Sequence, residues 1–256
     1  MISRIKEGHP YLTALQKRVM LFDGAMGTNL ESQNLTPANF GGKSFAGCND
    51  HLNLTFPSAV EKLHRSFLEA GVDVIETNTF RSNRFTLKEF GLADKVDMIN
   101  QAGAKLARRL ADEYSTPDQQ RFVAGSMGPT GILLSMDQSA SGFDEVNVAF
   151  REQATALIAG GVDLLQLETQ QDILEVKAAM IGIRQAFDIS GKWLPVQAQV
   201  TLDASGRMLL GTDIAAALAI LEGTGIDVIG INCSTGPDAM RGALGVLSQN
   251  SRLPIS

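Results

Sequence analysis

The sequence has few of the residues on which several protein classes depend. Among 256 residues there are two cysteines and three histidines, too few for a disulfide framework, and no Cys/His pair has the spacing of a zinc site. No stretch approaches the roughly 18 apolar residues of a membrane span. The first 22 residues also lack the continuous apolar segment of a secretory signal. We therefore expect no membrane association and a location in the reducing cytoplasm.

Basic residues are too few for a general nucleic-acid-binding protein. The formal net charge is −6, with 22 Lys and Arg against 28 Asp and Glu, and no basic cluster offsets this excess of acid. Hydrophobic residues make up 44% of the chain and charged residues 20%, which is typical of a globular protein with a full core. We expect a single domain over residues 1–256 and no nucleic-acid partner.

Short runs rich in β-branched residues alternate with longer amphipathic segments. The runs predict six strands, over residues 18–24, 72–79, 121–128, 162–169, 194–201 and 226–233. Apolar residues at three- and four-residue spacing predict helices that include 58–70, 94–114, 143–160, 213–223 and 239–251. Strands that are apolar on both faces and joined by helices are typical of a parallel sheet.

Three helix-to-strand junctions nearly repeat one another, as GVDVI, GVDLL and GIDVI from Gly71, Gly161 and Gly225. Glycine can end each helix in the left-handed conformation. Six such units in series favour an α/β fold of the (β/α)₈ TIM-barrel type. A doubly wound sheet is the less favoured alternative, because no G-x-G-x-x-G follows the first strand.

The last residues indicate where this barrel is interrupted. Residues 253–256 are interpreted as the beginning of a seventh strand, so we expect a barrel truncated C-terminally at about that point. Further β/α units and modules are expected downstream in a longer protein. A natural six-unit open sheet is the alternative, disfavoured because it would leave two strand edges unpaired.

Polar residues gather where the predicted strands end, which is where a TIM barrel has its active site. After the first strand, small residues at Gly24 and Ala25 can present backbone amides to an anion. Asp23 beside them would repel a phosphate but favour an ammonium group, so this turn suits a zwitterionic α-amino acid. Glu168 could add a second carboxylate. The alternatives are that Asp23 only stabilises its turn and that Glu168 only caps the next helix.

Asn232 and Cys233 end the sixth predicted strand. A lone cysteine in this position is most often a small apolar residue, and one thiolate is not a four-ligand zinc site. The other cysteine, Cys48, lies in a long loop after the first unit. Composition alone therefore gives a metal site little support.

Six short segments together resemble the homocysteine S-methyltransferase family. They are LFDGAMGTNLE at 21–31, GCNDHLNLTFP at 47–57, EAGVDVIETNTFRSN at 69–83, GSMGPTG at 125–131, LLQLETQQD at 164–172 and GINCSTGP at 230–237. Six matches in the right order make chance similarity improbable. GCNDHLNLTFP and ETNTF are most similar to the N-terminal homocysteine-binding domain of the cobalamin-dependent methionine synthases.

The resemblance implies a barrel that holds Zn²⁺ through three cysteines, one of which matches Cys233. The other two form an adjacent Cys-Cys pair that is expected beyond residue 256, which would explain why Cys233 has no partner in this sequence. The other implied roles are substrate binding by Asp23, Gly24, Ala25, Glu168 and Asn232, with Cys233 as the catalytic metal ligand. Glu76, Asn78 and Ser126 are expected only to line the walls of the site.

The implied reaction is methyl transfer to the thiolate of homocysteine, which gives methionine. The expected donor is methylcobalamin charged by methyltetrahydrofolate, with both cofactors on separate modules, because no D-x-H-x-x-G cobalamin motif occurs in this sequence. The 256 residues alone are expected to be inactive. The alternatives are a stand-alone enzyme that uses S-methylmethionine, S-adenosylmethionine or betaine, a fusion to methylenetetrahydrofolate reductase, and a non-catalytic amino-acid-binding module.

Overall fold

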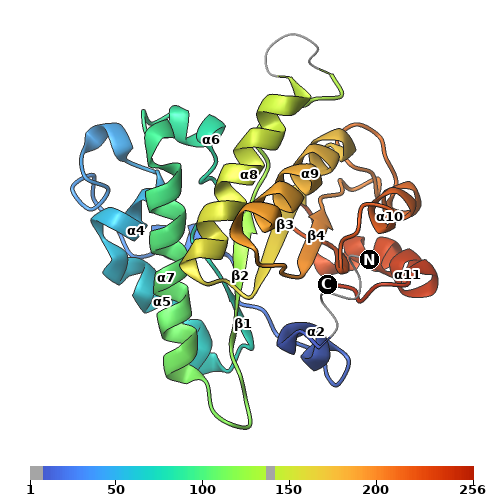
Figure 1. The fold of residues 1–256 in the computed structure, drawn as a ribbon, viewed down its shortest axis with the longest axis horizontal. Coiled ribbons are helices and arrows are strands. Elements are labelled where there is room, and N and C mark those ends of the chain that lie inside the picture. The colour runs from blue at the N-terminus through green and yellow to red at the C-terminus, as the bar shows by residue number, and fades with distance from the viewer. Residues whose placement is uncertain (1–7, 137–141) are drawn as a thin grey trace.

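The computed structural model describes residues 8–136 and 142–256. Five strands form one parallel sheet in the order β1-β2-β3-β4-β5, with α7, α8 and α9 packed across it (Figure 1). The strands are β1 (Val74–Glu76), β2 (Phe122–Met127), β3 (Leu164–Gln170), β4 (Val196–Val200) and β5 (Val228–Ile231). The helices are α2 (Pro10–Leu15), α3 (Met26–Glu31), α4 (Leu52–Thr55), α5 (Pro57–Ala70), α6 (Arg84–Lys88), α7 (Val96–Tyr114), α8 (Phe143–Gly160), α9 (Ile173–Ser190), α10 (Ile214–Glu222) and α11 (Pro237–Asn250), with short 3₁₀ turns η1 (Lys43–Phe45), η2 (Asn49–His51) and η3 (Ala93–Lys95).

The five strands predicted from residue 72 onward are confirmed as β1 to β5, with shorter bounds. The prediction of an extended strand over residues 18–24 is wrong, because only Phe22 forms a bridge, in parallel with Val74. Val19 and Leu21 are 82% and 59% exposed, so this segment lacks the cover on both faces that an inner strand has. At the opposite edge, where a seventh strand was expected, Ile255 bridges in parallel to Ile229.

The predicted helices are also present, with bounds that differ by a few residues. The segment 143–160 agrees with α8 at both ends, whereas 94–114 begins with the 3₁₀ turn η3 before α7. Gly71, Gly161 and Gly225 have φ angles of 100°, 95° and 83°. All three are therefore left-handed, and Gly71 and Gly161 end α5 and α8 as predicted. The prediction is wrong for Gly225, because α10 ends earlier, with Gly223 as its cap. No helix in the described ranges has the length and apolar character needed to cross a membrane.

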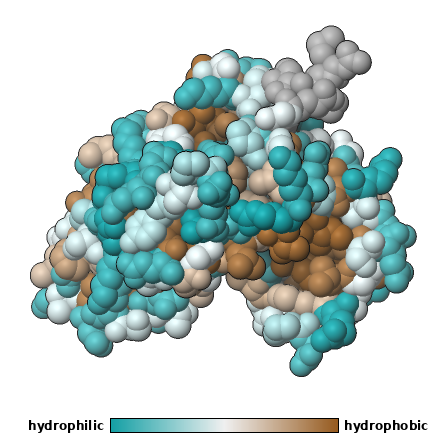
Figure 2. Space-filling view, turned by 90° about the horizontal axis from the view of Figure 1, so that it is seen from below, coloured by the Kyte–Doolittle hydropathy of each residue, from teal (hydrophilic) through white to brown (hydrophobic). Residues whose placement is uncertain are grey.

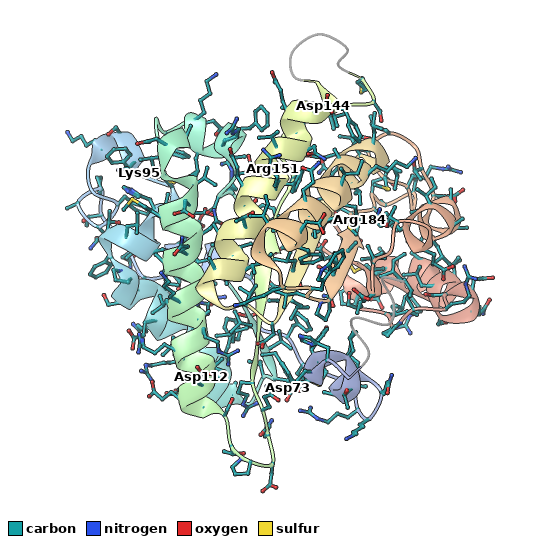
Figure 3. All side chains as sticks on the ribbon, in the orientation of Figure 1. Asp73, Lys95, Asp112, Asp144, Arg151 and Arg184 are labelled. Carbon is teal, nitrogen blue, oxygen red and sulfur yellow. The ribbon has the colours of Figure 1, made fainter. Side chains whose placement is uncertain are left out.

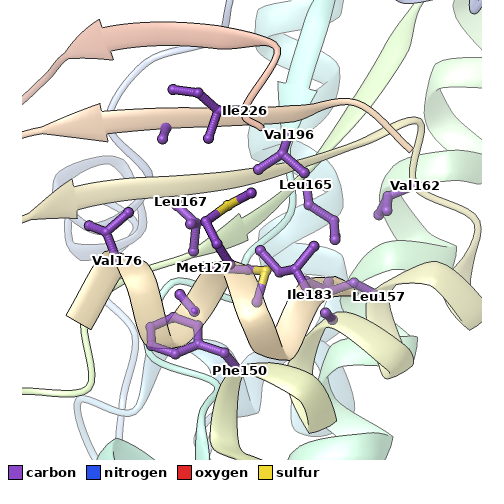
Figure 4. Packing of buried hydrophobic residues seen from close by; sticks show 14 of the residues in the cluster. Met127, Phe150, Leu157, Val162, Leu165, Leu167, Val176, Ile183, Val196 and Ile226 are labelled. Carbon is purple, nitrogen blue, oxygen red and sulfur yellow. The ribbon is translucent and has the colours of Figure 1, made fainter. Parts of the chain in front are cut away.

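Alternate residues of the strands form the main hydrophobic core with the helices. Leu165 and Leu167 of β3 and Val196 of β4 lie in one cluster with Phe150 of α8 and Ile183 of α9 (Figure 4). These side chains are fully buried. The period of two along each strand is what places them on a single face of the sheet.

The intervening strand residues change character along the strand. At the beginning of the strands they are apolar and pack with Tyr11 of α2; this cluster includes Val74, Phe122, Leu164 and Val228. Further along they are polar: Glu76, Ser126, Gln166, Glu168, Gln197 and Gln199. The expectation of apolar strand bodies was therefore wrong on this face, because Gln166, Gln197 and Gln199 are buried there.

The aspartate of each repeated junction forms a clamp on the preceding strand or strand segment. The carboxylate oxygens of Asp73, Asp163 and Asp227 accept hydrogen bonds from the backbone amides of Leu21, Val123 and Val196 at 3.0, 2.7 and 2.7 Å. Each aspartate amide also donates to the carbonyl of the same residue, at 2.8, 2.9 and 2.8 Å. The aspartate of the repeated sequence thus joins neighbouring strands at the end of the sheet opposite to the predicted site.

Asp73 is the most heavily bonded of these aspartates (Figure 3 labels it near the lower end of the molecule). Arg18 donates two hydrogen bonds of 2.7 Å to its carboxylate. Burial raises the pKa of Asp73, but the bonds from Arg18, the Leu21 amide and Gln119 outweigh it and lower the pKa to about 2. The charged form is therefore favoured by folding.

Replacing Asp73 by asparagine is expected to lower the free energy of unfolding at pH 7 by about 1.5–3 kcal/mol, the range for hydrogen bonds to a charged group. Because the folded pKa lies below the unfolded value of about 4, the charge stabilises the protein above that pH and ceases to do so as the pH falls through about 2. Urea unfolding between pH 7 and pH 2 measures this. Asp112→Asn, on the exposed face of α7, is the control, and a constant deficit across this pH range would contradict the assignment.

The two edges of the sheet line one cleft of about 660 Å³. One side is formed by residues 17–22 and the other by residues 254–256, with Gln197, Gln199 and Val228 between them. Figure 2 shows a hollow with apolar side chains on the face seen from below. The sheet therefore curves until its first and last paired segments face a common space.

Candidate active site

A cavity of about 580 Å³ lies where the strands end. All six residues predicted for the site line it: Asp23, Gly24, Ala25, Glu168, Asn232 and Cys233. The wall residues Glu76, Asn78 and Ser126 line it as well. The structure thus brings together every residue that the sequence indicated, from segments 210 positions apart.

Three carboxylates converge in this cavity. Both oxygens of Asp23 accept hydrogen bonds from the amide of Glu76, each at 3.1 Å. Ser126 Oγ donates to Glu168 Oε1 at 2.5 Å, and Asn232 Nδ2 donates to Glu168 Oε2 at 3.2 Å. Among residues 8–136 and 142–256, no Lys, Arg or His forms an ion pair with Asp23, Glu76 or Glu168.

The two simpler roles considered for these residues, turn stabilisation by Asp23 and helix capping by Glu168, do not account for their contacts. Asp23 reaches across to β1 rather than bonding only within its own turn. The helix after β3 is capped by Asp172, whose carboxylate accepts from the amide of Leu174. Glu168 is therefore left facing the cavity.

Burial and mutual repulsion make this cluster costly to ionise. Burial raises the pKa of Asp23 well above its usual value, and the charge of Glu168 raises it further. Burial likewise raises the pKa of Glu76, followed by the charges of Glu168 and Asp23. For Glu168, burial outweighs the hydrogen bonds from Ser126 and Asn232. A cation placed among the three would relieve both effects.

The backbone is distorted where Glu168 and Cys233 are positioned. The pairing of β3 with β4 shifts between Leu167 and Gln170, which is a bulge that includes Glu168. Thr169 and Cys233 have φ angles of 57° and 60°, a left-handed conformation that costs of order 1–3 kcal/mol for such residues. Asn232 fastens the two segments together, because its Oδ1 accepts from the Thr169 amide at 2.8 Å.

Cys233 presents an exposed thiol at this cavity. Thr169 Oγ1 and Asn232 Nδ2 lie 3.4 and 3.5 Å from its Sγ as hydrogen-bond donors. Cys48 also lines the cavity but is buried, and that burial raises its pKa to about 11. Within the described part of the chain, no group of three or more His, Cys, Asp or Glu side chains could hold a metal ion.

The turn at Gly24 and Ala25 has a different character from the carboxylate cluster. Both residues are exposed, and in the part of the chain that the structure describes neither amide has an acceptor. Asn29 Nδ2 holds the turn from the other side by donating to the Ala25 carbonyl at 2.7 Å. A Cβ at position 24 would lie 3.2 Å from the Phe67 ring, so glycine allows the turn to pack close to α5.

The homocysteine S-methyltransferase profile matches residues 20–256. The chain belongs to this family. Homocysteine S-methyltransferases of known structure share its fold: the metallated form of the homocysteine methyltransferase MmuM from Escherichia coli aligns with a TM-score of 0.78 and 23% identity over 96% of this chain and 85% of that chain. The apo form gives a TM-score of 0.70 over 94% and 82% of the two chains.

Longer relatives of this homocysteine S-methyltransferase chain are named methionine synthase. Those of Mycobacterium leprae and Mycobacterium tuberculosis are 44% and 43% identical to it over 245 residues, which is 96% of this chain. The aligned region is 20% of each relative. The chain therefore spans about a fifth of the length of these proteins.

Sequence reasoning underestimated Glu76, missed Gln166 and gave Thr169 no role although it placed it at a strand end. Glu76, expected only in the wall, is the third member of the carboxylate cluster. A signal was available, because Glu-Thr occurs at the C-terminal end of both strands: β1 ends at Glu76 with Thr77 next, and β3 has Glu168 and Thr169 just before its last residue. Two parallel strands that end alike place the same side chains at the same edge of a sheet.

Proposed function

We propose that this homocysteine S-methyltransferase chain is the homocysteine-binding barrel of a methionine synthase. The observation that supports this most directly is that three converging carboxylates, which lack a basic partner among the described residues, share one cavity with two backbone amides that have no acceptor there. An α-amino acid carries one cation and one anion on the same carbon, and so needs both kinds of partner in one cavity. The family to which the chain belongs indicates that this amino acid is homocysteine, and the exposed Cys233 lies at the same cavity.

In this proposal each end of homocysteine has its own partners. The ammonium group lies among Asp23, Glu168 and Glu76, while the carboxylate accepts from the Gly24 and Ala25 amides. The side chain then extends toward Cys233, which lies beside Thr169 in the same cavity. Fixing the amino acid at two points limits where its sulfur can be, which is the positioning that methyl transfer requires.

Zinc is the metal that the family resemblance implies, and the residues present fit it in part. Cys233 offers a soft ligand at the cavity, and the donors from Thr169 and Asn232 would orient a thiolate there. A zinc site takes four ligands, so this chain would contribute Cys233 and the expected Cys-Cys pair would contribute two more. When bound, zinc supplies the acidity that leaves the homocysteine sulfur deprotonated at neutral pH.

The remaining groups of the reaction are proposed to come from other modules. The sulfur lone pair of homocysteine forms the new bond to the methyl carbon, while the electrons of the broken bond stay with the donor and the thiol proton passes to solvent. Methylcobalamin recharged by methyltetrahydrofolate is the proposed donor, consistent with relatives named methionine synthase that are about five times longer. The cleft between the two sheet edges would then be filled by the strand that completes a TIM barrel.

Calorimetry with homocysteine and with its analogue 4-sulfanylbutanoate, which lacks the amino group, tests the proposed site. Because the analogue lacks the charge-assisted contacts of the ammonium group, it should bind at least about tenfold more weakly than homocysteine, since such bonds contribute about 1.5–3 kcal/mol. Equal affinity for the two compounds would contradict the assignment. Homocysteine affinity that survives both a chelator and Cys233→Ala would instead favour the non-catalytic amino-acid-binding alternative.

A further inference from the structure

A chain of buried side-chain hydrogen bonds runs from α2 to the candidate active site. Tyr11 Oη donates to Gln197 Oε1 at 2.9 Å, and Gln197 Nε2 donates to Gln166 Oε1 at 2.9 Å. Gln166 Nε2 in turn donates to Glu76 Oε1. Tyr11, Gln197 and Gln166 are each 0% exposed, so water does not offer these groups an alternative partner.

The series of hydrogen bonds begins at the end of the sheet remote from the cavity. Tyr11 belongs to α2, which lies near the lower end of the sheet in Figure 1. Its ring meets Phe122, the first residue of β2, edge-on at 5.7 Å. The hydrogen bonds therefore cross the polar face of the sheet, from Gln197 of β4 to its ladder partner Gln166 of β3 and on to Glu76, the last residue of β1.

The direction of these bonds is fixed at both termini. Burial raises the pKa of Tyr11, so its hydroxyl keeps its proton and can donate. Gln197 then accepts with its oxygen, which turns its NH₂ group toward Gln166, and the same applies to Gln166 toward Glu76. Reversing the amides would point the oxygen of Gln166 at the carboxylate of Glu76.

We propose that Tyr11, Gln197 and Gln166 form a positioning relay that holds Glu76 as a third carboxylate for the ammonium group of the substrate. This inference rests on the proposed function, because it assigns Glu76 a role in the same site. The relay gives Glu76 a donor that does not depend on substrate. Gln166 also lowers the pKa of the nearby Glu168, against the effect of burial.

Several other titratable or charged side chains share the cavity with Glu76. They are Asp23, Glu168, Asp50, Arg81, Cys48 and Cys233. Asp50 is held by Ser82 and the Arg81 amide, and the Arg81 guanidinium is paired with Glu89 at 2.6 Å. Asp23 and Glu168 are the charges that act on Glu76, and both oppose its ionisation. Gln166 is the hydrogen-bond donor that opposes them.

The test follows the titration of Glu76 by NMR in chain labelled with ¹³C at the glutamate carboxyl groups, with Glu76→Gln identifying the signal. In Gln166→Met the midpoint should rise by about one pH unit, the order expected when a hydrogen bond to the charged form is lost. Tyr11→Phe should raise the midpoint by a smaller amount, because the amides lose the donor that fixes their direction. The control is Tyr114→Phe, which removes the hydroxyl of the other tyrosine, on α7, and should leave the midpoint unchanged.

Each outcome decides the proposal. A rise in both variants supports the relay, whereas an unchanged midpoint in Tyr11→Phe overturns it even if Gln166→Met shifts. Tyr11→Phe also decides the matter if Gln166→Met does not fold. Because the titration needs no ligand, wild-type chain that failed to bind homocysteine would contradict the proposed function while leaving the relay to be judged by the midpoints.

Discussion

Replacing Cys233 by alanine is expected to reduce the rate of methyl transfer more than about a hundredfold. Removing a residue that only hydrogen-bonds to a metal ligand already lowers metal affinity or activity about 10–100-fold, and Cys233 is proposed to be a ligand itself. The assay uses the chain together with the segment that supplies the other zinc ligands, with homocysteine and methylcobalamin as substrates. Zinc content per chain, measured on the same samples, should fall in parallel. The reason is that Cys233 is the exposed thiol of the cavity, whereas Cys48 is buried.

Cys48→Ala is the matched control for that experiment. It removes the other cysteine of the chain from the wall of the same cavity, so it reports any general effect of losing a thiol there. We expect zinc content and turnover close to those of the wild type. Full zinc content with near-normal turnover in Cys233→Ala would remove the assignment of Cys233 as a ligand.

Neutralising Asp23 and Glu168 together is expected to weaken homocysteine binding by about a hundredfold or more, from two contacts of about 1.5–3 kcal/mol each. The two single variants, Asp23→Asn and Glu168→Gln, should lose less than half as much free energy of binding each. In each single variant the remaining carboxylates are repelled by one charge fewer, ionise more readily and compensate. In the double variant only Glu76 remains.

The pH dependence of binding provides a second measure of this coupling. Burial and mutual repulsion raise the pKa of Asp23 and Glu76, so homocysteine affinity should be lost, as the pH falls, at a higher pH than isolated carboxylates would require. The pH at which homocysteine affinity is lost should be lower in each single variant than in the wild type. Calorimetry with homocysteine and 4-sulfanylbutanoate measures both effects, and Asp238→Asn, exposed in the first turn of α11, is the control. Strictly additive losses with unchanged pH profiles would contradict the coupling.

Periodicity was sufficient for most of the fold because the chain repeats one local pattern. The helix over 143–160 and the left-handed Gly71, Gly161 and Gly225 follow from short-range rules. The segment 18–24 has the same local composition as a strand, but extended pairing depends on neighbours far away in the sequence. In this segment only Phe22 forms a ladder bridge, to Val74.

The site residues at the ends of strands could be predicted from the sequence, whereas those inside the strands could not. Asp23, Glu168 and Cys233 stand at those ends, so parallel pairing alone brings them together. Gln166 and Gln197 lie inside β3 and β4, and their roles depend on which residues face each other across the ladder. The alternation in LLQLET and VQAQV was visible in the sequence, yet the partner of each glutamine is set by strand register.

The clamps of Asp73, Asp163 and Asp227 have a consequence for how the sheet avoids misalignment. A strand displaced by one residue would turn its apolar side chains to the wrong face, and the hydrophobic effect opposes that error. A displacement by two residues keeps every side chain on its proper face, so burial alone offers little discrimination against it. Each aspartate bonds both the amide and the carbonyl of one particular residue, and a two-residue displacement breaks both bonds. Each junction aspartate thus fixes the register of one pair of neighbouring strands, at the end of the sheet that takes no part in substrate binding.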